Sequence, residues 1–210
     1  MKFLYLFDPL CGWCYAASPA ITTLASQHKV DAIATGLFAN TGKVLDTAFA
    51  QHAWQNDQRI AQLTGLPFSE KYHQNVLLAG GEFNSFYLSM ACHLLKQTMP
   101  SQLLPTLAQL QAVRYVDGSD TSQKQQVQEA LIALGKADIA KQMDNPDSHS
   151  QTNQWLQHGQ HLAQQLGVHG TPNLLAQVDD NWVVVPSQFL YQHDEHISTK
   201  IQAFLAEFAK

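Results

Sequence analysis

Two cysteines stand near the start of the chain at a spacing that suits dithiol chemistry, in the motif Cys11-Gly12-Trp13-Cys14. The pattern predicts a buried strand over residues 2–7 and a helix over 14–28, so the pair lies where the strand gives way to the helix. The free N–H groups and the dipole of a helix N-terminus favour a thiolate. We therefore expect Cys11, nearer the surface, to attack a disulfide, and Cys14, more buried, to resolve the mixed disulfide.

Other uses of the cysteines fit the sequence less well. A structural disulfide is disfavoured in a reducing compartment. A zinc site needs two further ligands, and the sequence has no second CxxC or His cluster at suitable spacing. Cys92 and His93 lie within the apolar helical run 86–95, where Cys92 is expected to be a packing residue. The sequence predicts redox chemistry and no metal.

The composition argues against two kinds of binding partner, nucleic acids and membranes. Of 210 residues only 14% are charged, against roughly 25% in an average soluble domain. The net charge is −5 and Lys and Arg do not cluster, which argues against nucleic acid. Apolar runs stay far below the ~20 residues of a membrane span, so no membrane association is expected.

The first residues bear on the cellular compartment. The apolar run after Lys2 ends at Asp8, and is shorter than the about 7–15 residues of a signal-peptide core. Cleavage of a signal at this position would also remove the Cys11 and Cys14 pair. We expect a cytoplasmic protein.

The elements expected beyond the cysteines alternate between strand and helix. A strand over 30–38 completes a β-α-β unit of the size of a parallel crossover. Asp120 or Thr121 is expected to cap one helix of the Gln-rich stretch that follows. The expected helices of that stretch are 45–64, 83–98, 102–116, 121–134 and 149–166.

The last part of the chain is predicted to return to strands. Asn173 to Val178 and Trp182 to Val185 flank Asp179-Asp180-Asn181, a hairpin turn signal, and a last helix is expected over 195–208. The fold class predicted is α/β, a thioredoxin-like fold with an inserted all-helical domain. The domains expected are a discontinuous thioredoxin-like unit, 1–40 with 167–210, and a helical insertion, 41–166.

Two motifs carry a resemblance to a known family. They are Gly170-Thr171-Pro172 and the segment Asp8-Pro9-Leu10-Cys11-Gly12-Trp13-Cys14-Tyr15. The chain resembles the DsbA family of thioredoxin-fold thiol-disulfide oxidoreductases, in its signal-less bacterial branch of protein-disulfide isomerase-like proteins. It is more distantly similar to FrnE-type proteins and to 2-hydroxychromene-2-carboxylate isomerases.

The resemblance implies roles for particular residues. Cys11 is then the nucleophile and Cys14 the resolving thiol. Pro172 is the cis-proline that faces the cysteine pair, and Thr171 presents backbone groups to a substrate chain, as in β-strand addition. Gly12 and Trp13 belong to the same substrate-binding surface. The implied partners are disulfide-containing polypeptides or low-molecular-weight thiols, with glutathione as a redox partner and no bound cofactor.

Three neighbouring residues keep more than one interpretation. Trp13 is either a contact for substrate or a packing residue against the helical block. Asp8 either tunes the thiols, by raising their pKa or relaying a proton, or caps the Asp8-Pro9 corner, and we favour the cap. His169 is the histidine nearest the site in sequence, where it either tunes the site or is a solvated loop residue.

The main hypothesis is a protein disulfide oxidoreductase or isomerase, expected to be a monomer and to favour reduction or isomerisation over net oxidation. One rival is a glutathione-dependent isomerase or transferase related to the kappa class. Those relatives carry Ser where this chain has Cys11, so two cysteines favour dithiol exchange. A second rival is a non-catalytic holdase that uses the helical block and Trp13 as an apolar surface.

Overall fold

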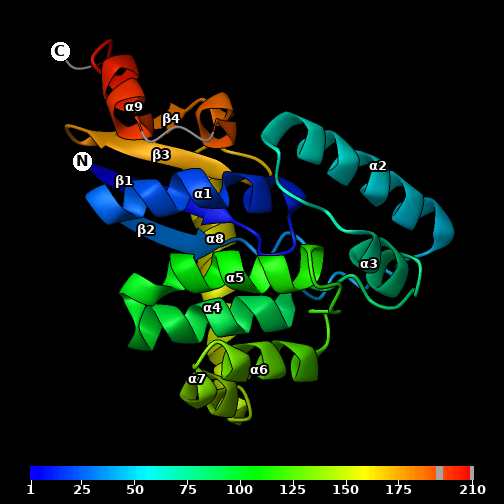
Figure 1. Ribbon diagram of the computed structural model, residues 1–210. Helices are drawn as coiled ribbons and strands as arrows, with labels where there is room; N and C mark the ends of the chain where they lie inside the picture. Colours follow the sequence, from blue (N-terminus) through cyan, green and yellow to red (C-terminus); the bar gives the residue numbers. More distant parts are fainter. Residues whose placement is uncertain (193–195, 209–210) are drawn as a thin grey trace.

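A four-stranded sheet organises the chain in a computed structural model that describes residues 1–192 and 196–208. The strand order is β2-β1-β3-β4, with β1 parallel to β2 and antiparallel pairing across the other two interfaces (Figure 1). From Phe3 onward β1 is buried, as a central strand must be. The strands are β1 (Lys2–Phe7), β2 (Lys29–Ala34), β3 (Asn173–Val178) and β4 (Asn181–Val185).

The crossover between the two parallel strands differs slightly from the prediction. Helix α1 (Gly12–Gln27) begins at Gly12 rather than at residue 14, which makes Cys11 its N-cap residue. Strand β2 ends at Ala34 instead of residue 38, because Gly36 turns the chain with a φ of 63°.

Between β2 and β3 the chain is helical, as predicted, and all five expected helices are present. Two short helices, α3 and α7, were not predicted, because three and six residues are too few to show a helical period. The elements of this stretch are α2 (Thr47–Thr64), α3 (Glu70–Tyr72) with a π-helical turn (His73–Leu77), α4 (Phe86–Thr98), a 3-10 turn (Pro100–Gln102), α5 (Leu103–Tyr115), α6 (Lys124–Ala133), α7 (Ala137–Gln142) and α8 (Pro146–Gln165).

The predicted cap of α6 is wrong. Its N-cap residue is Gln123, which makes no side-chain cap hydrogen bond. The Asp120 carboxylate instead accepts from the Ser122 amide at 3.1 Å and pairs with Arg114 at 3.3 Å. A buried guanidinium is a stronger partner than a helix end, so the aspartate serves the arginine and not the helix.

Helix α8 packs very closely on the sheet. A Cβ built at Gly159 would lie 2.2 Å from the carbonyl oxygen of Ala34 in β2, so this position needs a glycine. Figure 1 shows α1 in front of the strands and α8 behind them, while α4 and α5 lie below. The division into a unit of 1–40 with 167–210 and a helical unit of 41–166 stays a prediction.

The last part of the chain supplies the other two strands of the sheet and a final helix. Strands β3 and β4 form the predicted hairpin, with Asp179 at a φ of 51° in its turn. A 3-10 turn (Ser187–Tyr191) and helix α9 (Ile197–Leu205) follow. Residue 195 of the predicted last helix and residues 209–210 of the predicted domain lie outside the described residues. Within the described ranges, no helix is both long and apolar enough to cross a membrane.

Candidate active site

The cysteine motif forms the first turn of α1. The Cys11 amide donates to the Asp8 carbonyl oxygen at 3.0 Å, which closes the turn after β1. The Cys11 carbonyl oxygen accepts from the amides of Cys14 and Tyr15 at 2.9 and 3.0 Å, the first hydrogen bonds of the helix. Both cysteines are free thiols. Cys11 therefore lies at the positive end of the helix dipole, where a thiolate is stabilised.

The two thiols differ in exposure and in acidity. Cys11 is 7% exposed and Cys14 1% exposed, in the expected order. Hydrogen bonding from the Cys14 side chain lowers the pKa of Cys11, and this effect exceeds the opposing effect of burial. Burial and the neighbouring Cys11 sulfur raise the pKa of Cys14 well above its ordinary value. Cys11 is the thiol that ionises first, as a nucleophile must.

The loop before β3 meets the cysteine pair. The Thr171–Pro172 peptide bond is cis. Cys11 Sγ donates to the Thr171 carbonyl oxygen at 3.4 Å, so the fold brings the two sequence motifs into contact. The cis bond is the one that the family resemblance implies at Pro172, and the role of Thr171 in binding substrate stays a prediction.

Asp8 caps the corner after β1, which is one of the two roles expected from the sequence. Its carboxylate accepts from the amides of Leu10 at 2.9 Å and Phe38 at 3.0 Å, and from the Ser85 hydroxyl at 2.8 Å. The side chain is fully buried, and burial raises its pKa. Its charge also raises the pKa of Cys11, by less than the hydrogen bond from Cys14 lowers it.

Trp13 packs against the end of the chain. Its ring lies 4.9 Å from that of Tyr191, between centroids, in the 3-10 turn after β4. This packing partner is part of the C-terminal segment. The half-buried indole also lines a cavity beside Cys11, so a contact with substrate stays a prediction.

His169 and Cys92 lie apart from this cavity. His169 is exposed and borders a separate hollow together with Gly36 and Gly170. A role in tuning the thiols has no support from this placement. Cys92 is fully buried in α4, and burial raises the pKa of its thiol, which fits the expected packing role.

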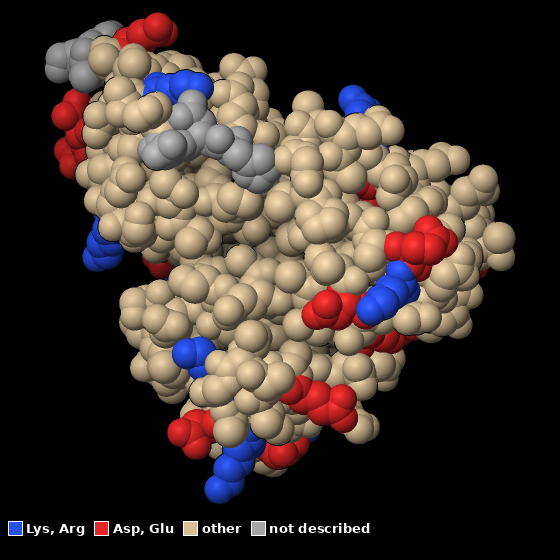
Figure 2. All heavy atoms as spheres, in the orientation of Figure 1, with Lys and Arg blue, Asp and Glu red and all other residues tan. Residues whose placement is uncertain are grey.

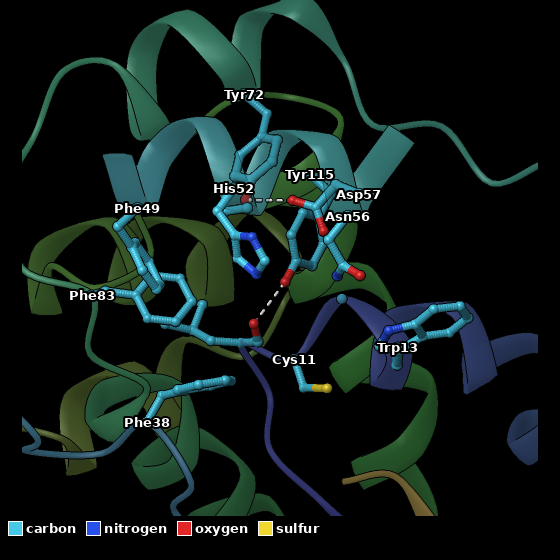
Figure 3. A pocket seen from close by; sticks show the side chains of 13 residues that line it. Cys11, Trp13, Phe38, Phe49, His52, Asn56, Asp57, Tyr72, Phe83 and Tyr115 are labelled. Carbon is cyan, nitrogen blue, oxygen red and sulfur yellow. Dashed lines mark hydrogen bonds between the residues drawn. The ribbon is translucent and has the colours of Figure 1, made fainter. Parts of the chain in front are cut away.

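A cavity of about 260 Å³ opens beside Cys11 (Figure 3). The start of α1 forms one wall of the cavity, α2 forms another, and aromatic rings form most of the remaining wall. The lining residues are Leu10, Cys11, Gly12, Trp13, Phe38, Phe49, His52, Ala53, Asn56, Asp57, Tyr72, Phe83 and Tyr115.

Asp57, the carboxylic acid of this cavity, is not among the site residues expected from the sequence. Burial raises its pKa to about 7, while hydrogen bonding from Tyr72 and the charge of Arg114 act in the opposite direction. Its spacing from Phe49 and Ala53 places it on the apolar face of α2. A carboxylate among apolar residues on one helix face was the signal that could have found it.

The described residues hold no group of three or more His, Cys, Asp or Glu side chains that could bind a metal ion. Charged side chains are also sparse on the face of the molecule drawn in Figure 2, where they lie in small groups on a surface that is otherwise uncharged.

Known proteins share this architecture. No curated protein matches the sequence. The cytosolic disulfide reductase DsbM from Pseudomonas aeruginosa has a TM-score of 0.85 at 25% identity, over 97% of this chain and 98% of that one. Its structure with GSH gives 0.84 at 24% identity, over 97% and 99%.

A more distant similarity, of fold, extends to an isomerase. A 2-hydroxychromene-2-carboxylate isomerase has a TM-score of 0.65 at 15% identity, over 100% of both chains, which shows a shared fold. The family model of the DSBA-like thioredoxin domain matches residues 5–198, from β1 into α9. The expected α/β fold with a thioredoxin-like sheet and inserted helices is confirmed, and the chain belongs to the DSBA-like thioredoxin domain family.

Proposed function

We propose that the protein is a thiol-disulfide oxidoreductase that reduces or isomerises disulfides through Cys11 and Cys14. The Cys11 thiolate attacks one sulfur of a substrate disulfide, so that a Cys11–substrate disulfide forms and the other sulfur leaves and takes up a proton. Cys14 then gives up its proton and attacks Cys11 Sγ. The second substrate thiol leaves, and the pair holds the disulfide that the substrate has lost.

One observation carries this proposal. Cys11 is the N-cap residue of α1 and has a lowered pKa, while the adjacent Cys14 has a raised one. The acidic thiol suits attack, and the protonated thiol suits the later resolving step. The same division of roles would be lost if both thiols were equally acidic.

The partners follow from the chemistry of reduction. Two molecules of a small thiol such as glutathione would return the pair to the dithiol, and would leave as their own disulfide. A relative solved with GSH supports a thiol partner of this kind. We place the protein in the cytoplasm, where glutathione keeps thiols reduced, in keeping with the cytosolic DsbM.

Reduction assays with matched serine variants test the proposal. Insulin represents protein disulfides and glutathione disulfide represents small ones. Wild type is expected to reduce at least one of them, Cys11→Ser neither, and Cys14→Ser is expected to accumulate a mixed disulfide that mass spectrometry detects. Equal activity of wild type and Cys11→Ser would overturn the proposal.

The same variants separate the rival functions. Full turnover of Cys14→Ser with glutathione would indicate a glutathione-dependent transferase or isomerase that needs one sulfur. Suppression of aggregation that survives loss of both cysteines, without any reductase activity, would indicate a holdase.

A further inference from the structure

Asp57 is a buried acid that the proposed exchange reaction leaves without a role. It is 5% exposed and lies in the cavity beside Cys11. Tyr72 Oη donates to Asp57 Oδ2 at 3.0 Å, and this is the one hydrogen bond of the Asp57 carboxylate among the described residues. A buried carboxylate has room for about four hydrogen bonds, so most of its acceptor capacity is unused.

The other carboxylate oxygen lies over the cysteine turn. A Cβ built on Gly12 would be 2.7 Å from Asp57 Oδ1, so this oxygen stands against the residue that follows Cys11. Figure 3 shows the Asp57 side chain reaching from α2 toward the segment that carries Cys11, on the border of the same cavity. A group held by Oδ1 would therefore be close to the reacting sulfur.

The rest of the cavity suits an organic cation. The rings of Phe38, Phe49, Phe83 and Tyr115 line it. Ring faces attract positive charge, and Lys43 Nζ, from outside the cavity lining, already lies 5.5 Å from the ring centroid of Phe38 and 5.8 Å from that of Phe49. Among the described residues, neither Lys nor Arg lines it, and His52 is the basic side chain at its border. An ammonium group placed here would meet one carboxylate and several ring faces.

Arg114 lies behind this wall and does not occupy the subsite. Its guanidinium stacks 5.6 Å from the ring centroids of both Tyr72 and Phe83. It is fully buried, and its Nη1 pairs with Asp120 at 3.3 Å. One guanidinium is thus shared by Asp120 and Asp57, so an ionised Asp57 leaves this cluster with an excess of negative charge.

We propose that Asp57 and the aromatic walls form a subsite for a primary ammonium group, and that the site prefers small disulfides of aminothiols. This inference rests on the proposed attack by Cys11. The sulfur bonded to Cys11 and the ammonium held by Asp57 belong to the same short chain. The Cys11–sulfur bond forms, the substrate S–S bond breaks, and the other aminothiol leaves as the thiol.

A charge series of disulfides of similar length tests the preference. The probes are cystamine, which is cationic, bis(2-hydroxyethyl) disulfide, which is neutral, and 3,3′-dithiodipropionate, which is anionic. Each kcat/KM is divided by the rate constant of the uncatalysed reaction with glutathione, because the leaving thiols differ in intrinsic reactivity. In wild type, normalised kcat/KM for cystamine is expected to exceed that for the neutral disulfide about tenfold, and the anionic disulfide is expected to be slowest.

Two variants assign the preference to Asp57. Asp57→Asn is expected to bring the ratio of cystamine to neutral disulfide close to one. Glu70→Gln removes a carboxylate that is exposed at the start of α3 and outside the cavity lining, and is expected to keep the ratio. The ratio of two kcat/KM values does not depend on the fraction of folded protein, so it can also be measured in a destabilised variant.

Binding of an unreactive amine separates this inference from the proposed function. The probe is 2-(methylsulfanyl)ethylamine, which has no disulfide, titrated by NMR into the reduced protein and into Asp57→Asn. Binding that weakens about tenfold in the variant would support the subsite even in a protein without reductase activity. Two results would overturn the inference. One is a wild-type protein that neither binds this amine nor favours cystamine, and the other is an Asp57→Asn variant that keeps the preference for cystamine.

Discussion

Cys11 Sγ donates a hydrogen bond to the Thr171 carbonyl oxygen at 3.4 Å, although 160 residues separate the two in the chain. The contact places the reactive sulfur beside the backbone that leads into β3. A substrate polypeptide that reaches Cys11 would lie along this backbone, where extended chains pair by β-strand addition. The relationship between these two residues thus joins the proposed site of attack to the proposed binding surface.

Alkylation rates should distinguish the three thiols. Cys11 has a lowered pKa, while those of Cys14 and Cys92 are raised. At pH 7 iodoacetamide is expected to modify Cys11 more than about tenfold faster than either of the others, because the thiolate is the reactive form. Peptide mass spectrometry over a time course measures the three rates. In Cys14→Ala the pH profile of Cys11 should shift upward, since Cys14 is the main cause of its acidity; an unchanged profile would contradict this assignment.

Cys92 should matter for stability and not for exchange. Its side chain is fully buried in α4, apart from the cavity beside Cys11. Cys92→Ala is expected to lower the free energy of unfolding by about 1–2 kcal/mol, because the smaller side chain leaves a void. Urea denaturation checks the loss, and disulfide reduction at a temperature where the variant is folded should proceed at the wild-type rate. A large loss of turnover would make Cys92 a redox partner.

Asp8→Asn should destabilise the protein in spite of its similar shape. The Asp8 carboxylate accepts three hydrogen bonds, one from Leu10, one from Phe38 and one from Ser85. An amide has only one acceptor oxygen, so its NH₂ group must face an N–H donor or a hydroxyl. The expected cost is about 2 kcal/mol, from one buried donor left without a partner. Denaturation of Asp8→Asn beside wild type measures it, and equal stability would show that the network rearranges.

Stability should fall with rising pH because of Asp57. Its pKa is about 7 in the folded protein, above the ~3.9 of an unfolded chain, so only the folded state keeps the proton between these values. The stabilisation is present below pH 4 and is lost as the pH rises through 7, by up to about 4 kcal/mol. An amide at this position does not titrate. The free energy of unfolding of Asp57→Asn, minus that of wild type, should therefore increase from pH 5 to pH 8. Denaturation of both proteins at the two pH values tests this, and parallel curves would contradict it.

Much of the fold could be predicted from neighbouring residues alone. Apolar strand residues, helical spacing and the turn at Asp179-Asp180 are local signals, and they located the sheet strands and the longer helices. The boundaries moved where a single local feature decided them. Gly36 ended β2 early, and Pro146 began α8 at its first position, before the predicted residue 149.

For the site, the sequence by itself determined which residues carry the proposed chemistry, because the spacing of Cys11 and Cys14 at a strand-helix junction already indicates a dithiol. Only the tertiary structure decided what surrounds it. Asp57 reaches Gly12 through the packing of α2 on α1, which no local pattern specifies. Its pKa and unused acceptor capacity arise from burial, and burial depends on contacts between residues far apart in the chain.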